Sequence, residues 1–585
     1  MEWFNTLGEK VAELMSGFSS EIFLYFTFII RFMLPFLAAI ILSRCIRSLL
    51  SEKYESEEWG YLSLPNGARI GLSHWENIIG RAKASDVFME YPTLSRTHAA
   101  VIRDARGQWS VYDLASKGGV TVNGREVSGN AAIKSGDVIK LGGVELVFVA
   151  HSKTKEREQA QYRTRPGKVV RQWVTLVFLT EFQILLGIQL CISQGDSLTM
   201  ATPLSFAALI AAGWLCYIIT RSLRRVAFEV ETIAFFLCSI GMAVTASSVP
   251  SDLFKQLIIL IAGICLYFAV GWFLRDLNRA KKMRWPIAAC GLLLLAVNLI
   301  FSEAIFGANN WLFIGGISLQ PSEFVKIAFI FAGSATMDRL FAKRNLLMFI
   351  GFAGACVGAL VLMGDFGTGL VFFVAYLIIA FLRSGDFATI FLSIGGAGLA
   401  GVLAISVKPY IAERFASWRH VWQDPHNAGY QQTRTMAAAA SGGLLGVGAG
   451  NGWLKKIVAA DTDMVFGMVS EELGLIVALM MILAVLILAV FAIRSAQTAR
   501  SSFYAIAACA SVSIMIFQII LNVLGSVDIL PFTGVTFPFI SKGGSSLMAT
   551  WGLLAFVKAA DTRQNASFAI KMPKREKQQD MDVTI

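Results

Sequence analysis

Long apolar runs separated by short charged loops fill most of the chain beyond Trp173. These runs are centred near residues 183, 211, 237, 265, 295, 333, 355, 375, 396, 480, 514 and 553, and an earlier run covers residues 22–44. A helix needs about 20 apolar residues to cross a bilayer. The pattern therefore predicts a polytopic α-helical membrane protein with about 13 spans in total, the first of them an anchor at 22–44.

Residues 55–152 follow a different pattern. Short stretches in which apolar and polar residues alternate, such as WSVYDL at 109–114 and DVIKLG at 137–142, are separated by Gly, Asp, Asn and Ser. Alternation of this kind is typical of strands, and many short strands between turn residues indicate a small all-β sandwich. We expect this domain to be inserted after the first span, with a basic linker at 153–172 leading to two further spans within 173–224.

Composition and charge argue against a soluble enzyme, because 55% of the residues are hydrophobic and only 16% are charged. A net charge of +11 in a soluble domain would suggest nucleic acid, but here much of the Lys and Arg lies in short loops between apolar runs. In membrane proteins the loops on the cytoplasmic side carry an excess of Lys and Arg. The distribution predicts an external N-terminus at 1–21, a cytoplasmic β domain, a disordered cytoplasmic tail at 561–585, and no nucleic-acid partner.

The longest external loop is predicted at residues 408–466, and long loops in compact proteins are usually functional. Asp461 and Asp463 lie near its end, and Glu471 and Glu472 follow just before the next apolar run. By charge pattern alone, Asp463 is better explained as a solvated loop acid that the dipole of the following helix favours. A catalytic role requires support from other parts of the chain.

Three short motifs in the β domain resemble the forkhead-associated (FHA) family. They are GRAKASD at 80–86, LSRTH at 94–98 and VNG at 122–124. That family binds phosphothreonine peptides with loops at one end of a β-sandwich, so the resemblance implies a phosphothreonine protein as a partner. Eight Cys are scattered without metal-ligand spacing, so disulfides and structural zinc are not expected.

The FHA resemblance also implies roles for individual residues. Arg81 and Ser95 would contact the phosphate, since the planar donors of Arg fork onto two oxygens. Asn123 would belong to the same phosphopeptide site, and His98 would support its loops. The chain departs from the family at Gly118, where an Asn that holds the peptide backbone is usual, and this departure puts phosphopeptide binding in question.

Five segments in residues 225–560 resemble the SEDS proteins, the RodA and FtsW family of bacterial peptidoglycan glycosyltransferases. They occur in family order as WLFIGGISLQPSEFVK at 311–326, GDFGTG at 364–369, WQDPHNAGYQ at 422–431, ADTDMVFGMVSEELG at 460–474 and LPFTGVTFPFISKGGSS at 530–546. The resemblance implies a SEDS fold in the bacterial cytoplasmic (inner) membrane. It also implies polymerisation of lipid II into glycan strands at the outer face.

The family register implies that Asp463 is the catalytic residue and that Asp461 is not. Glycosyl transfer needs a base that takes a proton from a sugar hydroxyl, and an aimed carboxylate serves this purpose. Glu471 and Glu472 would be structural, as ion-pair or hydrogen-bond partners, because an unpaired charge in a membrane helix is costly.

Several further charged residues are expected around the substrate. Glu323 and Lys326 share a helix face and would line the cavity, with Lys326 either paired to Glu323 or reaching the lipid diphosphate. Asp365 would line the same cavity from a broken apolar run. External-loop cations are candidates for diphosphate contact and are equally explained as solvated charges: Arg414, Arg419, Lys455 and Lys456. Lys542 is assigned no role.

Two other functions remain open at this point. The cavity charges also suit a lipid II transporter (flippase) without chemistry, and a third interpretation is a catalytically inactive cell-wall scaffold. The family usually acts with a class B penicillin-binding protein, so such a transpeptidase is an expected partner. No cofactor is required by the sequence, and use of a divalent metal is left open.

Overall fold

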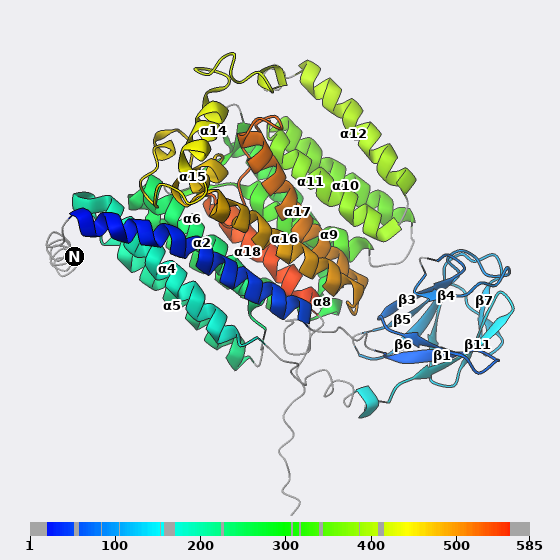
Figure 1. The fold of residues 1–585 in the computed structure, drawn as a ribbon. Helices are drawn as coiled ribbons and strands as arrows, with labels where there is room; N and C mark the ends of the chain where they lie inside the picture. Colours follow the sequence, from blue (N-terminus) through cyan, green and yellow to red (C-terminus); the bar gives the residue numbers. More distant parts are fainter. Residues whose placement is uncertain are drawn as a thin grey trace, which may run out of the picture.

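The chain folds into a helical bundle with a β-sandwich beside one end of it (Figure 1). The computed structural model describes residues 20–51, 58–83, 85–104, 106–152, 154–156, 170–223, 227–305, 308–314, 317–337, 343–384, 387–407 and 415–561. Arg414, nearly all of the 1–21 segment, most of the 153–172 linker and residues 562–585 lie outside the described residues.

Each predicted apolar run coincides with a helix. The helices are α2 (Ser20–Ser51), α4 (Gln172–Gln194), α5 (Ala201–Ser222), α6 (Glu229–Ser248), α7 (Leu253–Leu274), α8 (Leu277–Phe301), α9 (Pro321–Met337), α10 (Lys343–Leu362), α11 (Phe366–Ser384), α12 (Phe387–Val407), α16 (Leu475–Gln497), α17 (Ser502–Ser526) and α18 (Gly544–Ala560). These helices and the β-sandwich after the first of them confirm the predicted fold class.

Nine helices within the described residues are long and apolar enough to cross a membrane, by length and composition. The sequence prediction of about 13 spans also counts four further helices that are not among these nine: α9, α10, α12 and α18. Of these, α9 and α18 have 17 residues each. In α10 and α12 the described apolar segments are Leu347–Leu362 and Ile390–Leu399.

Helix α6 lies at the centre of the bundle, and its apolar segment is buried along its whole length. A buried ion pair joins it to α18, since Lys558 Nζ lies 3.0 Å from Glu231 Oε1 and both side chains are fully buried. Tyr267 of α7 donates its hydroxyl to the same Glu231 oxygen. An unpaired charge at this depth would cost several kcal/mol, so the three helices depend on one another.

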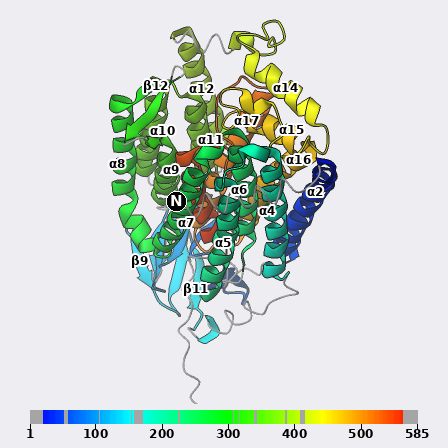
Figure 2. The same cartoon turned by 90° about the vertical axis from the view of Figure 1, so that its left-hand side faces the viewer.

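The N-terminal anchor and the two spans after the linker pack along one side of the bundle, where α2, α4, α5 and α6 lie side by side (Figures 1 and 2). Glu229, the first residue of α6, holds two of them. Its Oε1 accepts a hydrogen bond from Ser48 Oγ of α2 at 2.6 Å and from Gln172 Nε2 of α4 at 2.7 Å. Helices α2 and α4 are therefore joined to α6 by specific buried hydrogen bonds.

Two antiparallel-rich sheets make up the β-sandwich. One has the order β2-β1-β11-β10-β7-β8 and the other β4-β3-β5-β6-β9. Their facing side chains, including Leu62, Val101 and Phe148, form a core separate from that of the bundle. The strands are β1 (Gly60–Ser63), β2 (Arg69–Leu72), β3 (Glu76–Gly80), β4 (Val87–Phe88), β5 (Ala99–Arg103), β6 (Trp109–Asp113), β7 (Val120–Val122), β8 (Arg125–Glu126), β9 (Asn130–Ile133), β10 (Val138–Leu141) and β11 (Val144–Ala150).

A small three-stranded antiparallel sheet was not anticipated from the sequence. It consists of β12 (Glu303–Ile305), β13 (Ala308–Ile314) and β14 (Ile317–Leu319), between α8 and α9. Two of its strands have only three residues each, which is too short for an alternation of apolar and polar residues to predict them. The sheet leads directly into α9, which carries Glu323 and Lys326.

The β-sandwich contacts the turn between α16 and α17. Trp75 N–H donates to the carbonyl of Arg500 at 2.6 Å, and His74 Nδ1 lies 2.8 Å from the carbonyl oxygen of Ala499. The carboxylate of Glu76 accepts hydrogen bonds from the hydroxyls of Ser501 and Ser502 and from Ser502 N–H. Glu76 is only 8% exposed, so this contact is a packed interface.

Candidate functional site

Asp463 lies in a tight turn that precedes α15 (Val465–Glu472). Ala459 adopts a positive φ of 62°, which turns its carbonyl back towards the following residues. That carbonyl accepts hydrogen bonds from Asp463 N–H at 2.9 Å and from Thr462 Oγ1 at 3.1 Å. The local backbone therefore holds Asp463 in one defined position just before the N-terminus of the buried helix α15.

Two distant segments fix this turn from outside. Ser541, in the loop before α18, donates its hydroxyl to the carbonyl of Thr462 at 2.6 Å. Asn522 of α17 donates Nδ2 to the carbonyl of Asp463 at 3.1 Å and to that of Val535 at 2.8 Å. The 460–474 and 530–546 motifs are therefore in direct contact.

A cavity of about 260 Å³ opens at Asp463. Gly534, whose φ is +67°, brings its backbone so close that a Cβ there would lie 3.4 Å from Asp463 Oδ2. Uncharged side chains of α14 (Tyr430–Gly442) face the same space. The described lining residues are Ser417, Ala428, Gln431, Gln432, Ala459, Asp463, Phe532 and Gly534, so Asp463 is the one carboxylate among them.

Asp461 has different surroundings. Its carboxylate accepts a hydrogen bond from Ser248 Oγ at 3.1 Å and lies 3.5 Å from Lys542 Nζ. Lys542 also pairs with Asp252 at 2.8 Å. Lys542, to which the sequence analysis assigned no role, is therefore an ion-pair partner that ties three loops together.

Glu471 and Glu472, at the end of α15, accept hydrogen bonds from a neighbouring loop. Glu471 binds the N–H groups of Trp453 and Leu454 at 2.8 and 3.0 Å. Glu472 binds Gly450 N–H at 2.8 Å and the hydroxyl of Ser247. Helix α15 lies outside the candidate membrane spans, and burial raises the pKa of Glu472 to about 7. Both carboxylates thus hold the backbone of the loop at residues 450–454.

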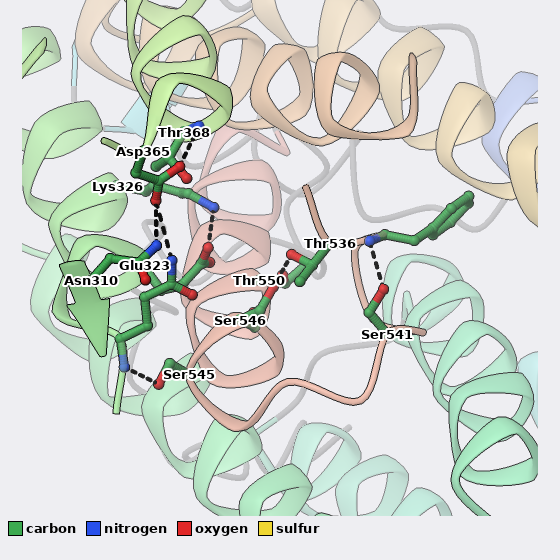
Figure 3. Close-up of polar contacts among 12 residues, drawn as sticks. Asn310, Glu323, Lys326, Asp365, Thr368, Thr536, Ser541, Ser545, Ser546 and Thr550 are labelled. Atoms are coloured by element: carbon green, nitrogen blue, oxygen red, sulfur yellow. Dashed lines mark hydrogen bonds and ion pairs between the residues drawn. The ribbon is translucent and has the colours of Figure 1, made fainter. Parts of the chain in front are cut away.

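Glu323, Lys326 and Asp365 lie close together at a buried polar cluster (Figure 3). Lys326 Nζ donates to Glu323 Oε1 at 2.7 Å, and the two side chains are almost fully buried. Of the two roles considered for Lys326, pairing with Glu323 is the one present in this structure.

Asp365 is the N-terminal cap of α11. Its Oδ1 accepts a hydrogen bond from Thr368 N–H at 3.0 Å, as capping carboxylates do. Its Oδ2 accepts from Asn310 Nδ2 of β13 at 2.8 Å (Figure 3). The residue therefore joins the small β-sheet to the start of a membrane helix.

Three of the predicted external-loop cations, Arg419, Lys455 and Lys456, lie within the described residues. Arg419 is exposed, and its guanidinium lies 5.3 Å from the ring centroid of Trp418. Lys455 Nζ donates to the carbonyl of Gly450, and Lys456 is exposed. None of these three is among the described residues that line the cavity.

A second cavity, of about 630 Å³, lies on the β-sandwich beside the residues expected to bind phosphate. Arg81, Lys83 and Arg96 contribute three positive charges to its wall. Arg81 N–H donates to the carbonyl of Ser95 at 3.0 Å, so the two predicted phosphate-binding residues are adjacent. The cavity is lined by Arg81, Ala82, Lys83, Phe88, Glu90, Pro92 and Arg96.

His98 supports the loops around this cavity. It is fully buried, accepts a hydrogen bond from Ser95 N–H at 3.1 Å through Nδ1, and lies 3.0 Å from the carbonyl oxygen of Gly119 through Nε2. Asn123, with φ 49°, instead holds its own turn, since Oδ1 accepts from Val138 N–H and Nδ2 donates to Asp137, both at 2.9 Å.

Gly118 is in close contact with a second glycine. A Cβ at position 118 would lie 2.7 Å from Gly142 Cα, which is too close for any real side chain. The loop that contains Gly142 therefore occupies the space that a side chain at position 118 would need. An Asn at position 118 would force the two backbones apart.

Four residues of the candidate site were missed by sequence reasoning: Gln431, Gln432, Asn522 and Ser541. Asn522 carried a usable signal, because a buried amide in the apolar run IFQIILNVL is costly without a specific bond. The other three lie in polar or mixed segments where nothing in the pattern separates them from their neighbours. Within the described residues, no group of three or more His, Cys, Asp or Glu side chains is placed to hold a metal ion.

Comparison with known proteins gives two family matches. The model of the cell cycle protein family that includes FtsW, RodA and SpoVE matches residues 205–566. The model of the FHA domain matches residues 77–142. Both resemblances drawn from the sequence motifs are confirmed by these matches.

Two relatives in other bacteria support the match to the FtsW, RodA and SpoVE family. Peptidoglycan glycosyltransferase RodA of Mycobacterium tuberculosis is 28% identical over 325 residues, which cover 52% of this chain and 69% of that protein. Probable peptidoglycan glycosyltransferase FtsW of Tolumonas auensis is 32% identical over 349 residues, covering 56% and 90%. A structure described as a peptidoglycan synthase complex is 25% identical, covers 57% of this chain and 96% of that one, and has a TM-score of 0.48.

Proposed function

This chain belongs to the FtsW, RodA and SpoVE family and is a peptidoglycan glycosyltransferase with an FHA domain, and on that premise we propose that it polymerises lipid II with Asp463 as general base. A sugar hydroxyl attacks the anomeric carbon of the lipid-linked strand. The new glycosidic bond forms, the bond from that carbon to the lipid diphosphate breaks, and Asp463 takes the proton of the hydroxyl.

The single observation that carries the proposal is the placement of Asp463 as the one carboxylate among the described residues of its cavity. A general base must lie within hydrogen-bond reach of the proton that it removes. Gln431 and Gln432 are suited to hydrogen-bond the hydroxyls of a sugar, because amide groups both donate and accept. Asp461 is not among the described residues that line this cavity, and its carboxylate lies 3.5 Å from Lys542 Nζ.

We propose that the Asp463 cavity faces the outside of the bacterial cytoplasmic membrane and that the FHA domain lies in the cytoplasm. The Lys- and Arg-rich loops support this orientation, since such loops stay on the cytoplasmic side. A reporter inserted near Asn427 is expected to read external, and one placed after Gly60 is expected to read cytoplasmic. A cytoplasmic reading at Asn427 would overturn the orientation.

The FHA domain is proposed to bind a phosphothreonine protein at the cavity lined by Arg81, Lys83 and Arg96. A phosphothreonine carries close to two negative charges and three acceptor oxygens, which suit a cluster of Arg and Lys donors. We further propose a class B penicillin-binding protein as the partner of the membrane domain, as the SEDS resemblance implies.

Purified protein, incubated with lipid II and no other enzyme, tests the activity directly. We expect glycan strands, separated by size on a gel, from wild type. A protein that moves lipid II across vesicles but makes no strands, alone or with a class B transpeptidase, would be a transporter. Binding of lipid II without either reaction would make it an inactive scaffold.

A further inference from the structure

We propose that Asn522 and Ser541 are positioning residues that aim the Asp463 carboxylate, an inference that rests on the proposed role of Asp463. Ser541 donates to the carbonyl of Thr462, and Asn522 donates to the carbonyl of Asp463 itself. These two carbonyls belong to the peptide groups on either side of the Asp463 Cα. Holding both peptide planes fixes φ and ψ of Asp463, and with them the direction of its side chain.

The Ser541 hydroxyl is itself oriented. It accepts a hydrogen bond from Phe537 N–H at 2.8 Å, so its single proton is directed to the Thr462 carbonyl at 2.6 Å. Ser541 is only 3% exposed, so water does not compete for this bond. Replacing Ser541 by Ala would remove the acceptor for the buried Phe537 N–H and the donor to the partly buried Thr462 carbonyl.

Only the donor group of the Asn522 side chain, Nδ2, makes hydrogen bonds within the described residues. The side chain is 2% exposed within the apolar helix α17, and its Oδ1 has no hydrogen-bond partner among the described residues. A buried acceptor without a partner destabilises the folded state, because it has given up its hydrogen bonds to water. The two bonds made by Nδ2, to Asp463 and Val535, are the contacts that offset this cost.

Asn522 also holds the loop that forms one wall of the cavity, through its hydrogen bond to the Val535 carbonyl. Val535 follows Gly534, at which an added Cβ would lie 3.4 Å from Asp463 Oδ2. One amide group therefore sets both the base and the loop against which it is aimed. Loss of this amide should misplace the base without removing it.

The test compares Ser541→Ala and Asn522→Leu with wild type in the lipid II polymerisation assay. Misplacing a catalytic group by about 1 Å costs on the order of 100-fold, so we expect kcat to fall by about 10- to 100-fold with the KM for lipid II within about twofold. Ser541→Thr keeps the hydroxyl and should recover most of the activity. The matched control is Ser511→Ala, which removes a buried hydroxyl bonded within α17 at 2.7 Å and should leave kcat unchanged.

The decisive measurement repeats both substitutions in an Asp463→Asn background. Residues that act only through Asp463 have nothing further to lose once the base is absent, so the effects should not add. Losses that multiply with that of Asp463→Asn, or that appear in KM, would overturn the positioning role. Full activity of Asp463→Asn alone would instead reject the proposed function.

Folding is monitored by the thermal midpoint of each variant in detergent. If Asn522→Leu does not give folded protein, the Ser541 series carries the test by itself. A loss of activity in Ser541→Ala that Ser541→Thr does not recover, in a folded protein, would also count against the inference.

Discussion

The Glu76 carboxylate of the β-sandwich caps helix α17 by accepting a hydrogen bond from Ser502 N–H at 2.9 Å. These residues lie 426 positions apart in the chain. A carboxylate at a helix N-terminus satisfies free N–H groups and complements the helix dipole. The FHA domain is therefore attached to the same helix that carries Asn522, and Glu76 opens strand β3, which ends one residue before Arg81.

Replacing Glu76 by Ala should weaken this attachment. Loss of a helix cap costs about 0.5–2 kcal/mol. We expect faster hydrogen exchange at the first turn of α17 and a lower thermal midpoint. The exposed acid Glu145, paired only with Lys140 at the surface, provides the control, and Glu145→Ala should change neither. Unchanged exchange at Ser502 in Glu76→Ala would show that the cap contributes nothing.

Arg81→Ala and Ser95→Ala should each abolish most phosphothreonine-peptide binding. A hydrogen bond to a charged group is worth about 1.5–3 kcal/mol, so affinity should fall at least about tenfold. The measurement is fluorescence anisotropy with labelled phosphorylated and unphosphorylated peptides on the full chain in detergent. Wild-type protein that binds both peptide forms equally would contradict a phosphate-specific site.

Gly118→Asn, which restores the residue usual in FHA domains, should harm this one. The added Cβ would lie 2.7 Å from Gly142 Cα, and such overpacking typically costs about 1–3 kcal/mol. We expect a lower unfolding midpoint and no gain in peptide affinity. Gly129→Asn is the control for adding a side chain at a turn, since a Cβ there meets no other atom within 4 Å, although its φ of +88° adds some strain. Tighter binding by Gly118→Asn would show that the loop adapts.

Asp463→Asn should lose glycan synthesis while keeping the fold and lipid II binding. A positioned general base contributes about 100- to 10,000-fold, equivalent to roughly 3 to 5 kcal/mol of barrier. Asp461→Asn should lose far less, because its carboxylate faces Lys542 and Ser248.

Both Asp variants are compared for polymer yield at matched protein level, with and without excess divalent cation. Partial recovery of Asp463→Asn by added cation would indicate that the carboxylate holds a metal instead of acting as base. Wild-type activity in Asp463→Asn would remove it from the reaction altogether.

Glu472 should make stability depend on pH. Its pKa is raised from 4.5 to about 7 by burial, so between these values the folded chain keeps a proton that the unfolded chain releases. The contribution of Glu472 to the free energy of unfolding is therefore complete below about pH 4.5. It is lost as the pH rises through about 7, and it amounts to at most about 3 kcal/mol. Glu472→Gln keeps the shape and should flatten this slope between pH 5 and 8, measured by thermal midpoints. Equal slopes in both proteins would contradict the shift.

Periodicity and motif order predicted the helices, the sandwich and the two families, because apolar length and strand alternation are local properties of a sequence. The partners of Asp463 were not predictable in this way. Asn522 and Ser541 act through bonds to main-chain carbonyls, which any residue supplies, so no complementary side chain marks them. The ion pairs of Lys542 are likewise not visible in the sequence, since its partners Asp252 and Asp461 are close to it only in the folded chain.

The pairing of Glu231 with Lys558 bears on how the protein is made. The ribosome delivers α6 well before α18, and 327 positions separate the two residues. Until the last helix arrives, Glu231 lacks its cation, and a carboxylate buried without one costs several kcal/mol. We therefore expect the bundle to close fully around α6 only after α18 has been inserted. A chain cut short before Lys558 would be an unfinished protein, exposed to proteolysis, and not a shorter working enzyme.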